Sequence, residues 1–142
     1  MRALLDVNVL VALLDAQHVG HAKAHQWLAE SLAEGWASCP ITENGCVRVL
    51  TNPRYPAPVA AAEVLTKLAT AKSGSGHRFW PDDVSLTDQS VFDRSQLRGH
   101  QQVTDAYLLG LAVGHGGCLA TFDSGIESAI VTGARAENLI TI

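Results

Sequence analysis

Four acidic side chains stand where strands end or helices begin in the predicted fold. Asp6 ends the first apolar run of the chain, and Asp123 follows the apolar run 118–121. Glu43 and Asp105 each come directly after a threonine suited to cap a helix. Carboxylate oxygens favour Mg²⁺ or Mn²⁺ over zinc, and these cations position water and stabilise charge in phosphodiester hydrolysis. The four acids are therefore predicted to bind the metal and to be catalytic.

Each acid also has an ordinary structural explanation. The helix dipole favours an acid in the first turn of a helix, and an aspartate after a strand often forms an Asx-turn. These explanations cover Glu43, Asp105 and Asp123 taken singly. They do not cover Asp6, which lies within an apolar run and is expected to be buried. Carboxylates that share one pocket repel one another, and a divalent cation removes that repulsion, so the set is more informative than its members.

Alternating strand-like and helical segments predict how the acids are brought together. The apolar spacing indicates helices near residues 24–32, 42–50, 61–68, 103–113 and 126–130, and strands at 3–6, 36–39, 77–80, 118–121 and 139–142. Thr42 and Thr104 are predicted to cap two of the helices. This alternation is typical of an α/β fold whose parallel sheet is covered on both faces. Ligands in such folds collect at the carboxyl ends of the strands, where the acids lie.

Length and composition favour one domain that spans residues 1–142. The chain has 142 residues, of which 47% are hydrophobic, enough for one core and too few for two ordinary domains. Asp6 and Asn8 interrupt the apolar start, and no segment approaches the roughly 20 apolar residues that a membrane span needs. The three widely spaced cysteines fit neither a disulfide framework nor a metal knuckle. A soluble, cytoplasmic protein with buried, reduced thiols is expected.

The charge of the chain is unevenly distributed. Its net charge of −4 argues mildly against nucleic-acid binding, because phosphate affinity comes mainly from Lys and Arg. Residues 48–98, however, hold seven basic and five acidic residues. A bound cation would offset part of the negative charge elsewhere, so a nucleic-acid substrate stays compatible with the composition.

Several motifs resemble those of PIN-domain toxins of the VapC type. They are Leu-Leu-Asp-Val-Asn-Val-Leu at 4–10, Pro-Ile-Thr-Glu-Asn-Gly at 40–45, Val-Arg-Val-Leu-Thr-Asn-Pro at 47–53, the stretch 77–86, Val-Thr-Asp-Ala-Tyr-Leu at 103–108 and Leu-Ala-Thr-Phe-Asp at 119–123. The resemblance covers nearly the whole chain. It implies a three-layer α/β/α sandwich with a five-stranded parallel sheet, Mg²⁺- or Mn²⁺-dependent RNA cleavage, a homodimer, and inhibition by a VapB-like antitoxin.

The resemblance also implies roles for particular residues. Asp6, Glu43, Asp105 and Asp123 fall on the four acidic positions of the family. Asn8 matches a polar residue that supports the first acid, while Thr104 and Thr121 match hydroxyl positions beside the third and fourth. One departure is Val7, where many relatives have Thr or Ser. The missing hydroxyl is expected to weaken the support of the site without removing a ligand.

Other polar residues have weaker functional interpretations. Arg98 and His100 precede Asp105 and are candidate contacts for RNA phosphate, although isolated basic residues are usually just solvated. His18, His21 and His25 lie on one helical stripe, but no cysteine or carboxylate nearby completes a zinc site. We interpret these histidines as a cap at a helix start and surface packing.

Two other protein classes also gather acids at strand ends. A receiver domain needs a lysine after its last strand, and the only lysines are Lys23, Lys67 and Lys72. A haloacid-dehalogenase phosphatase needs Asp-x-Asp, where this chain has Asp6-Val7-Asn8. The alternatives that stay open are a catalytically silent PIN-fold binding module and a DNA-directed nuclease of the same fold.

Overall fold

Five parallel strands form the centre of the fold. The computed structural model describes residues 1–142, and its strands are β1 (Ala3–Leu5), β2 (Trp36–Ser38), β3 (His77–Phe79), β4 (Cys118–Thr121) and β5 (Leu139–Thr141). Their order is β3-β2-β1-β4-β5, with parallel pairing throughout. The predicted α/β fold with a five-stranded parallel sheet is confirmed. Strand order reverses at β1, so a ligand site is expected at the carboxyl ends of β1 and its neighbours.

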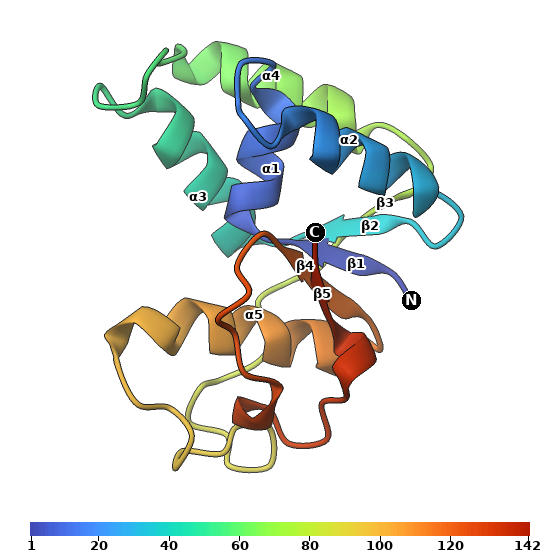
Figure 1. The fold of residues 1–142 in the computed structure, drawn as a ribbon, viewed down its shortest axis with the longest axis vertical. Helices are drawn as coiled ribbons and strands as arrows, with labels where there is room; N and C mark the ends of the chain where they lie inside the picture. Colours follow the sequence, from blue (N-terminus) through green and yellow to red (C-terminus); the bar gives the residue numbers. More distant parts are fainter.

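Helices cover both faces of this sheet (Figure 1). Helices α1 (Val7–Leu14), α2 (His21–Glu30), α3 (Pro40–Thr51) and α4 (Ala61–Lys72) lie on one side, and α5 (Val103–Gly114) lies on the other. Short 3-10 turns are η1 (His100–Gln102), η2 (Ser128–Ile130) and η3 (Ala136–Asn138); η2 replaces the helix predicted for 126–130. Alternate residues of β1 reach the two cores, because Ala3 and Leu5 pack with α1 while Leu4 packs with α5.

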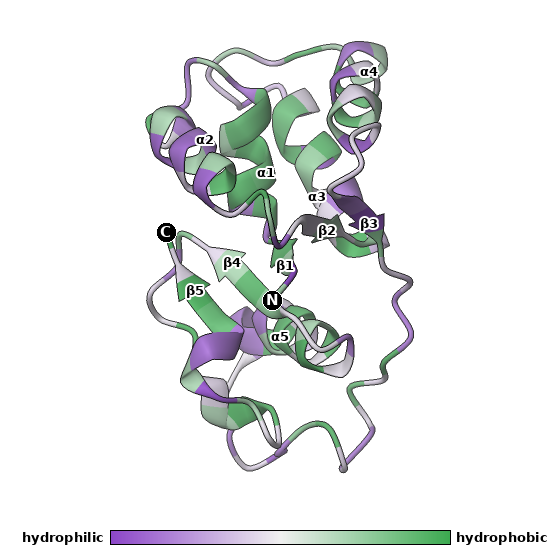
Figure 2. Cartoon of the chain, turned by 90° about the vertical axis from the view of Figure 1, so that its right-hand side faces the viewer, coloured by the Kyte–Doolittle hydropathy of each residue, from purple (hydrophilic) through white to green (hydrophobic).

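Helix α1 follows β1 directly, at a boundary that the apolar pattern of the sequence does not mark. The carboxylate of Asp6 accepts a hydrogen bond from the backbone N–H of Val7 at 2.7 Å and so caps the helix. Figure 2 shows α1 as a largely hydrophobic helix beside α2 and α3. Residues 9–12 are buried. Every residue of α1 except Asn8 is apolar, and a short continuous apolar run does not distinguish a buried helix from a strand, so the sequence analysis predicts the strand 3–6 and no helix after it.

Both predicted threonine caps are wrong. Helix α3 begins at Pro40 with Cys39 as its N-cap, and the Thr42 hydroxyl lies inside the first turn, where it accepts from the Cys39 backbone N–H at 3.0 Å. Proline suits the first helical position because no partner is needed there for its missing N–H. Helix α5 begins at Val103, directly after η1, so Thr104 is its second residue. Glu43 and Asp105 still occupy the first turns of these helices.

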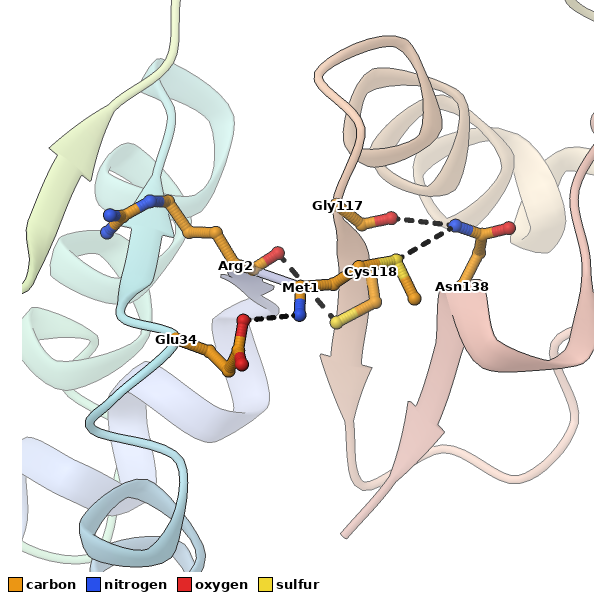
Figure 3. A network of polar contacts seen from close by, with 6 residues as sticks. All are labelled: Met1, Arg2, Glu34, Gly117, Cys118 and Asn138. Atoms are coloured by element: carbon orange, nitrogen blue, oxygen red, sulfur yellow. Dashed lines mark hydrogen bonds and ion pairs between the residues drawn. The ribbon is translucent and has the colours of Figure 1, made fainter.

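A polar network holds the amino ends of the central strands (Figure 3). The N-terminal amine of Met1 donates to Glu34 at 2.7 Å, which ties the start of β1 to the loop before β2. The Asn138 amide donates to the Gly117 carbonyl at 2.8 Å, which ties η3 to the start of β4. These contacts lie at the end of the sheet opposite the carboxyl ends of β1 and β4. The network therefore supports the sheet without occupying the expected ligand end.

Two expectations about the whole chain can be compared with the structure. Cys39, Cys46 and Cys118 are buried and unpaired, as predicted. No helix combines the length and apolar character needed to cross a membrane.

Candidate active site

Three of the four predicted acids line one cavity. Asp6 follows β1, Asp123 lies just beyond β4, and Asp105 is in the first turn of α5. All three border a cavity of about 380 Å³ at the carboxyl ends of the central strands. Their elements come from opposite ends of the chain, and the pairing of β1 with β4 brings them together.

Asp6 is the most buried of these acids. Only 7% of the residue is exposed. Its carboxylate accepts from the Thr121 hydroxyl at 2.6 Å and from the Val7 backbone N–H at 2.7 Å. Burial raises the pKa of Asp6 and outweighs these two hydrogen bonds, which lower it; the charge of Asp123 raises it further. The metal-free protein thus holds a proton on Asp6 more strongly than an exposed aspartate would.

A hydroxyl and an amide hold the segment around Asp6. The Thr121 oxygen accepts from the Asn8 side-chain amide at 3.1 Å and from the Asp123 backbone N–H at 3.0 Å, while its hydrogen is donated to Asp6. The Asn8 carbonyl oxygen accepts from the Phe122 backbone N–H at 3.2 Å. Thr121 and Asn8 therefore fix Asp6 relative to the residues that follow β4.

Asp105 and Asp123, together with Asp6, form the acidic part of the cavity lining, here called the acidic wall. Burial raises the pKa of Asp105, and the charges of Asp6 and Asp123 raise it further. The Asp123 carboxylate accepts from the Gly125 backbone N–H at 2.7 Å, which forms the Asx-turn anticipated as its structural role. Thr104, in contrast, is exposed and does not line the cavity.

Glu43 does not line the cavity and has other partners. Its carboxylate accepts from the Ser38 hydroxyl at 2.6 Å and pairs with the Lys72 ammonium at 2.6 Å. Ser38 is also hydrogen-bonded to the His77 ring at 2.8 Å. The Glu43 side chain is 18% exposed, so the ion pair is partly shielded from water. Lys72 thus supplies the positive charge that Glu43 was predicted to obtain from a metal.

Besides the acids and Asn8, five further residues line the same cavity, and the sequence analysis proposed none of them as a site residue. His18 and Tyr55 line it together with the apolar side chains of Val7, Val11 and Val49. His18 bonds to the turn before α2, as its capping interpretation suggests, since its Nδ1 accepts from the Gly20 backbone N–H at 2.9 Å. His18 lies in the turn before α2 and not on the helical stripe predicted for it, and Tyr55 lies in the loop after α3, where no periodic pattern marks it.

Arg98 and His100 lie apart from the acidic cavity. Both are exposed and border a separate hollow together with Gly99, Gln101 and Gln102. This hollow directly precedes α5, the helix that contains Asp105. The two residues are therefore connected to the acidic wall through the chain rather than through a shared cavity.

The chemistry of the acidic wall fits a divalent cation, although the side chains are not arranged as a closed ligand sphere. No three His, Cys, Asp or Glu side chains converge closely enough to surround one ion. The three carboxylates nevertheless present only oxygen ligands to one cavity. Burial raises the pKa values of Asp6 and Asp105, and repulsion among the carboxylates raises them further; a bound cation would offset both effects.

Comparison with known proteins places this fold and site in a family. The family model described as the PIN domain matches residues 3–130. Ribonuclease VapC44 of Mycobacterium tuberculosis (strain ATCC 25618 / H37Rv) is 51% identical over 142 residues, which cover all of both chains. Ribonuclease VapC39 of the same strain is 43% identical over 134 residues, covering 94% of this chain and 96% of that protein. The chain therefore belongs to the PIN-domain family and to its VapC ribonuclease group.

A solved structure shares the fold at low sequence identity. It is described as Mycobacterium tuberculosis VapC20, a Sarcin-Ricin loop cleaving toxin, and it superposes with a TM-score of 0.62 at 15% identity. The similarity covers 94% of this chain and 98% of that one. At this identity the comparison supports the arrangement of sheet and helices, not a shared substrate.

Proposed function

We propose that this protein is a divalent-metal-dependent endoribonuclease that acts as the toxin of a VapBC-type toxin–antitoxin pair. The observation that supports this most directly is the convergence of Asp6, Asp105 and Asp123 on one cavity. The full-length similarity to VapC ribonucleases agrees with it. Asp6, Glu43, Asp105 and Asp123 are the proposed metal-binding and catalytic residues.

The cation is Mg²⁺ or Mn²⁺, which when bound stabilises the negative charge that develops on the phosphate and activates water. The chain's own residues fix the ligands. Thr121 and the Val7 backbone N–H orient the Asp6 carboxylate, and the Gly125 backbone N–H orients Asp123. Glu43 is proposed as the fourth acid, and it would hold the cation only after its ion pair with Lys72 is broken.

We also propose the partners that this activity requires. The substrate is RNA, and Arg98 and His100 contact its phosphates beside the start of α5; their exposure and position before Asp105 support this role. A VapB-like antitoxin inhibits the protein, and two copies form a dimer, as the family resemblance implies. The protein acts in the cytoplasm, where free buried thiols such as Cys39, Cys46 and Cys118 stay reduced.

Cleavage assays with matched variants test this proposal. The parent protein should cleave generic RNA with Mn²⁺ and lose activity in EDTA, and Asp6→Asn should abolish cleavage. Asp88→Asn is the control, because Asp88 is exposed and its carboxylate accepts only from Ser90 in a local turn. Cleavage of DNA but not RNA would indicate the DNA nuclease. No cleavage of either by a folded, metal-saturated protein would indicate the silent binding module. Sequencing of RNA 5′ ends after induced expression would then identify the target.

A further inference from the structure

The part of the cavity lining that lacks carboxylates, here called the base-binding wall, has the composition of a base-binding surface. It combines two ring-bearing side chains, His18 and Tyr55, with the apolar side chains of Val7, Val11 and Val49. We infer that this wall is a nucleobase subsite, which takes the base next to the phosphate that is cleaved. The inference rests on the proposed ribonuclease function, since the phosphate is assigned to the acidic wall.

The Tyr55 ring is held in place before any ligand arrives. Its hydroxyl donates to the Asp15 carboxylate, and its backbone N–H donates to the Asn52 carbonyl at 2.8 Å. Burial and the neighbouring Asp15 raise the pKa of Tyr55 to about 12, so the hydroxyl stays protonated and keeps donating. A ring fixed in this way loses little conformational freedom when a base stacks on it, and every base has a face that can stack.

The His18 ring is fixed by the loop that joins α1 to α2. Its backbone N–H donates to the Asp15 carbonyl at 3.0 Å, and its Nδ1 accepts from the Gly20 N–H at 2.9 Å. Because Nδ1 is an acceptor, the neutral ring carries its hydrogen on Nε2, which is a donor for a base or ribose oxygen. Asp15 thus anchors both His18 and Tyr55, so the two rings form one preorganised unit.

This loop also contacts the segment that leads to Asp123. A Cβ atom added at Gly20 would lie 3.0 Å from the Phe122 ring and 3.2 Å from His18 Nδ1, so Gly20 is enclosed between the two side chains. Phe122 directly precedes Asp123 in the chain. The base-binding wall and the acidic wall are therefore joined by packing, and their separation is fixed.

Charge and size decide which part of an RNA fits here. No Lys or Arg lines the cavity, so nothing on this wall would attract a second phosphate. An uncharged planar group is the part of a nucleotide that suits an aromatic and apolar wall. The volume of about 380 Å³ is within the range of small-ligand sites. A neighbouring hollow of about 230 Å³ shares Val7 and Val49 and contains Arg48, a suitable contact for the next phosphate along the strand.

Binding and cleavage measured on the full chain test the inference separately. The binding probe is a short RNA with 2-aminopurine at one position, whose fluorescence is quenched when the base stacks. In EDTA, which prevents cleavage of the probe, the parent and Tyr55→Trp should quench it, whereas Tyr55→Leu should bind about tenfold more weakly with little quenching. His18→Ala should also weaken binding. His25→Ala is the control, because His25 is exposed and bonds only to the Leu13 carbonyl.

The cleavage arm uses RNA randomised around one position, with the products sequenced. The parent should show a base preference next to the cut. Tyr55→Leu should lose that preference and raise KM about tenfold, while kcat stays within about threefold, as expected for lost stacking of one base. Unchanged preference and unchanged quenching in a folded Tyr55→Leu protein would overturn the subsite. A parent that cleaves no RNA would overturn the proposed function instead, and the quenching data would still decide the subsite.

Discussion

The Thr121 hydroxyl is the best place to test how the site is held, because one atom makes three hydrogen bonds. It donates to the Asp6 carboxylate at 2.6 Å and accepts from Asn8 and from the Asp123 N–H. The residue is fully buried. Thr121→Val keeps the shape of the side chain and removes the hydroxyl, so the change isolates these bonds from packing.

The expected cost follows from what each bond joins. A hydrogen bond to a charged group contributes about 1.5–3 kcal/mol, and the bonds from Asn8 and Asp123 add about 1 kcal/mol together because water reaches both residues in part. The extra methyl of valine returns somewhat under 1 kcal/mol. Thr121→Val should therefore lower the free energy of unfolding by about 2–3 kcal/mol at pH 7.5 in EDTA. Thr121→Ser keeps the hydroxyl, loses one methyl and should cost about 1 kcal/mol.

The pH dependence of this loss gives a second measurement. The bond from Thr121 lowers the pKa of Asp6, so its contribution is present when Asp6 is ionised and is lost as pH falls and Asp6 becomes protonated. Urea unfolding of the parent, Thr121→Val and Thr121→Ser at pH 7.5 and pH 3.5 should show a smaller difference at the lower pH. If Thr121→Val is as stable as Thr121→Ser at pH 7.5, the hydroxyl does not hold the Asp6 carboxylate and our account of the site is wrong.

Three further predictions concern the acids. Asp105→Asn should abolish Mn²⁺-dependent cleavage while Asp88→Asn leaves the rate unchanged; equal damage by both would remove Asp105 from the site. In EDTA the free energy of unfolding of the parent should fall as pH rises from about 4 through the raised pKa values of Asp6 and Asp105. The reason is that the folded state holds these protons more strongly than the unfolded state does. Saturating Mn²⁺ should reverse the fall. Denaturation at several pH values checks this, and a rise over that range would contradict it. Lys72→Met should tighten Mn²⁺ binding roughly threefold to tenfold in calorimetry, because it removes a cation and frees Glu43; weaker binding would show that the ion pair prepares Glu43 for the metal.

The sequence predicts the sheet better than the helix boundaries. All five strands lie where short apolar segments indicate them, and β1, β2 and β4 are buried. The edge strands β3 and β5 are partly exposed. Helix α1 escapes prediction because all of its residues except Asn8 are apolar, and such a run is as typical of a buried strand as of a buried helix. Helix α3 begins two residues before its predicted start because Pro40 begins a helix here. Helix α5 begins at Val103, as predicted, but η1 leads into it without the predicted Thr104 cap. The local preferences of the residues alone do not locate these helix starts.

The sequence also predicts one part of the site and misses another. Asp6, Asp105 and Asp123 are predictable because a parallel sheet brings strand ends and helix starts together. The partner of Glu43 is not, since Lys72 reaches it from the end of α4 and nothing in the sequence near either residue indicates the pairing. His18 and Tyr55 escape for a related reason. Asp15 joins them through a loop conformation that only the folded chain defines.

The pairing of β1 with β4 has a consequence for how the protein is made. Asp6 is synthesised among the first residues, whereas Asp105 and Asp123 come near the end. At roughly 5–20 residues per second, a ribosome takes roughly 6–23 s to travel between Asp6 and Asp123. Until residue 105 is made, the nascent chain contains only one of the three cavity acids, and Asp123 joins last. Every unfinished copy therefore lacks the complete acidic cavity, which forms only after β4 has left the ribosome and docked beside β1.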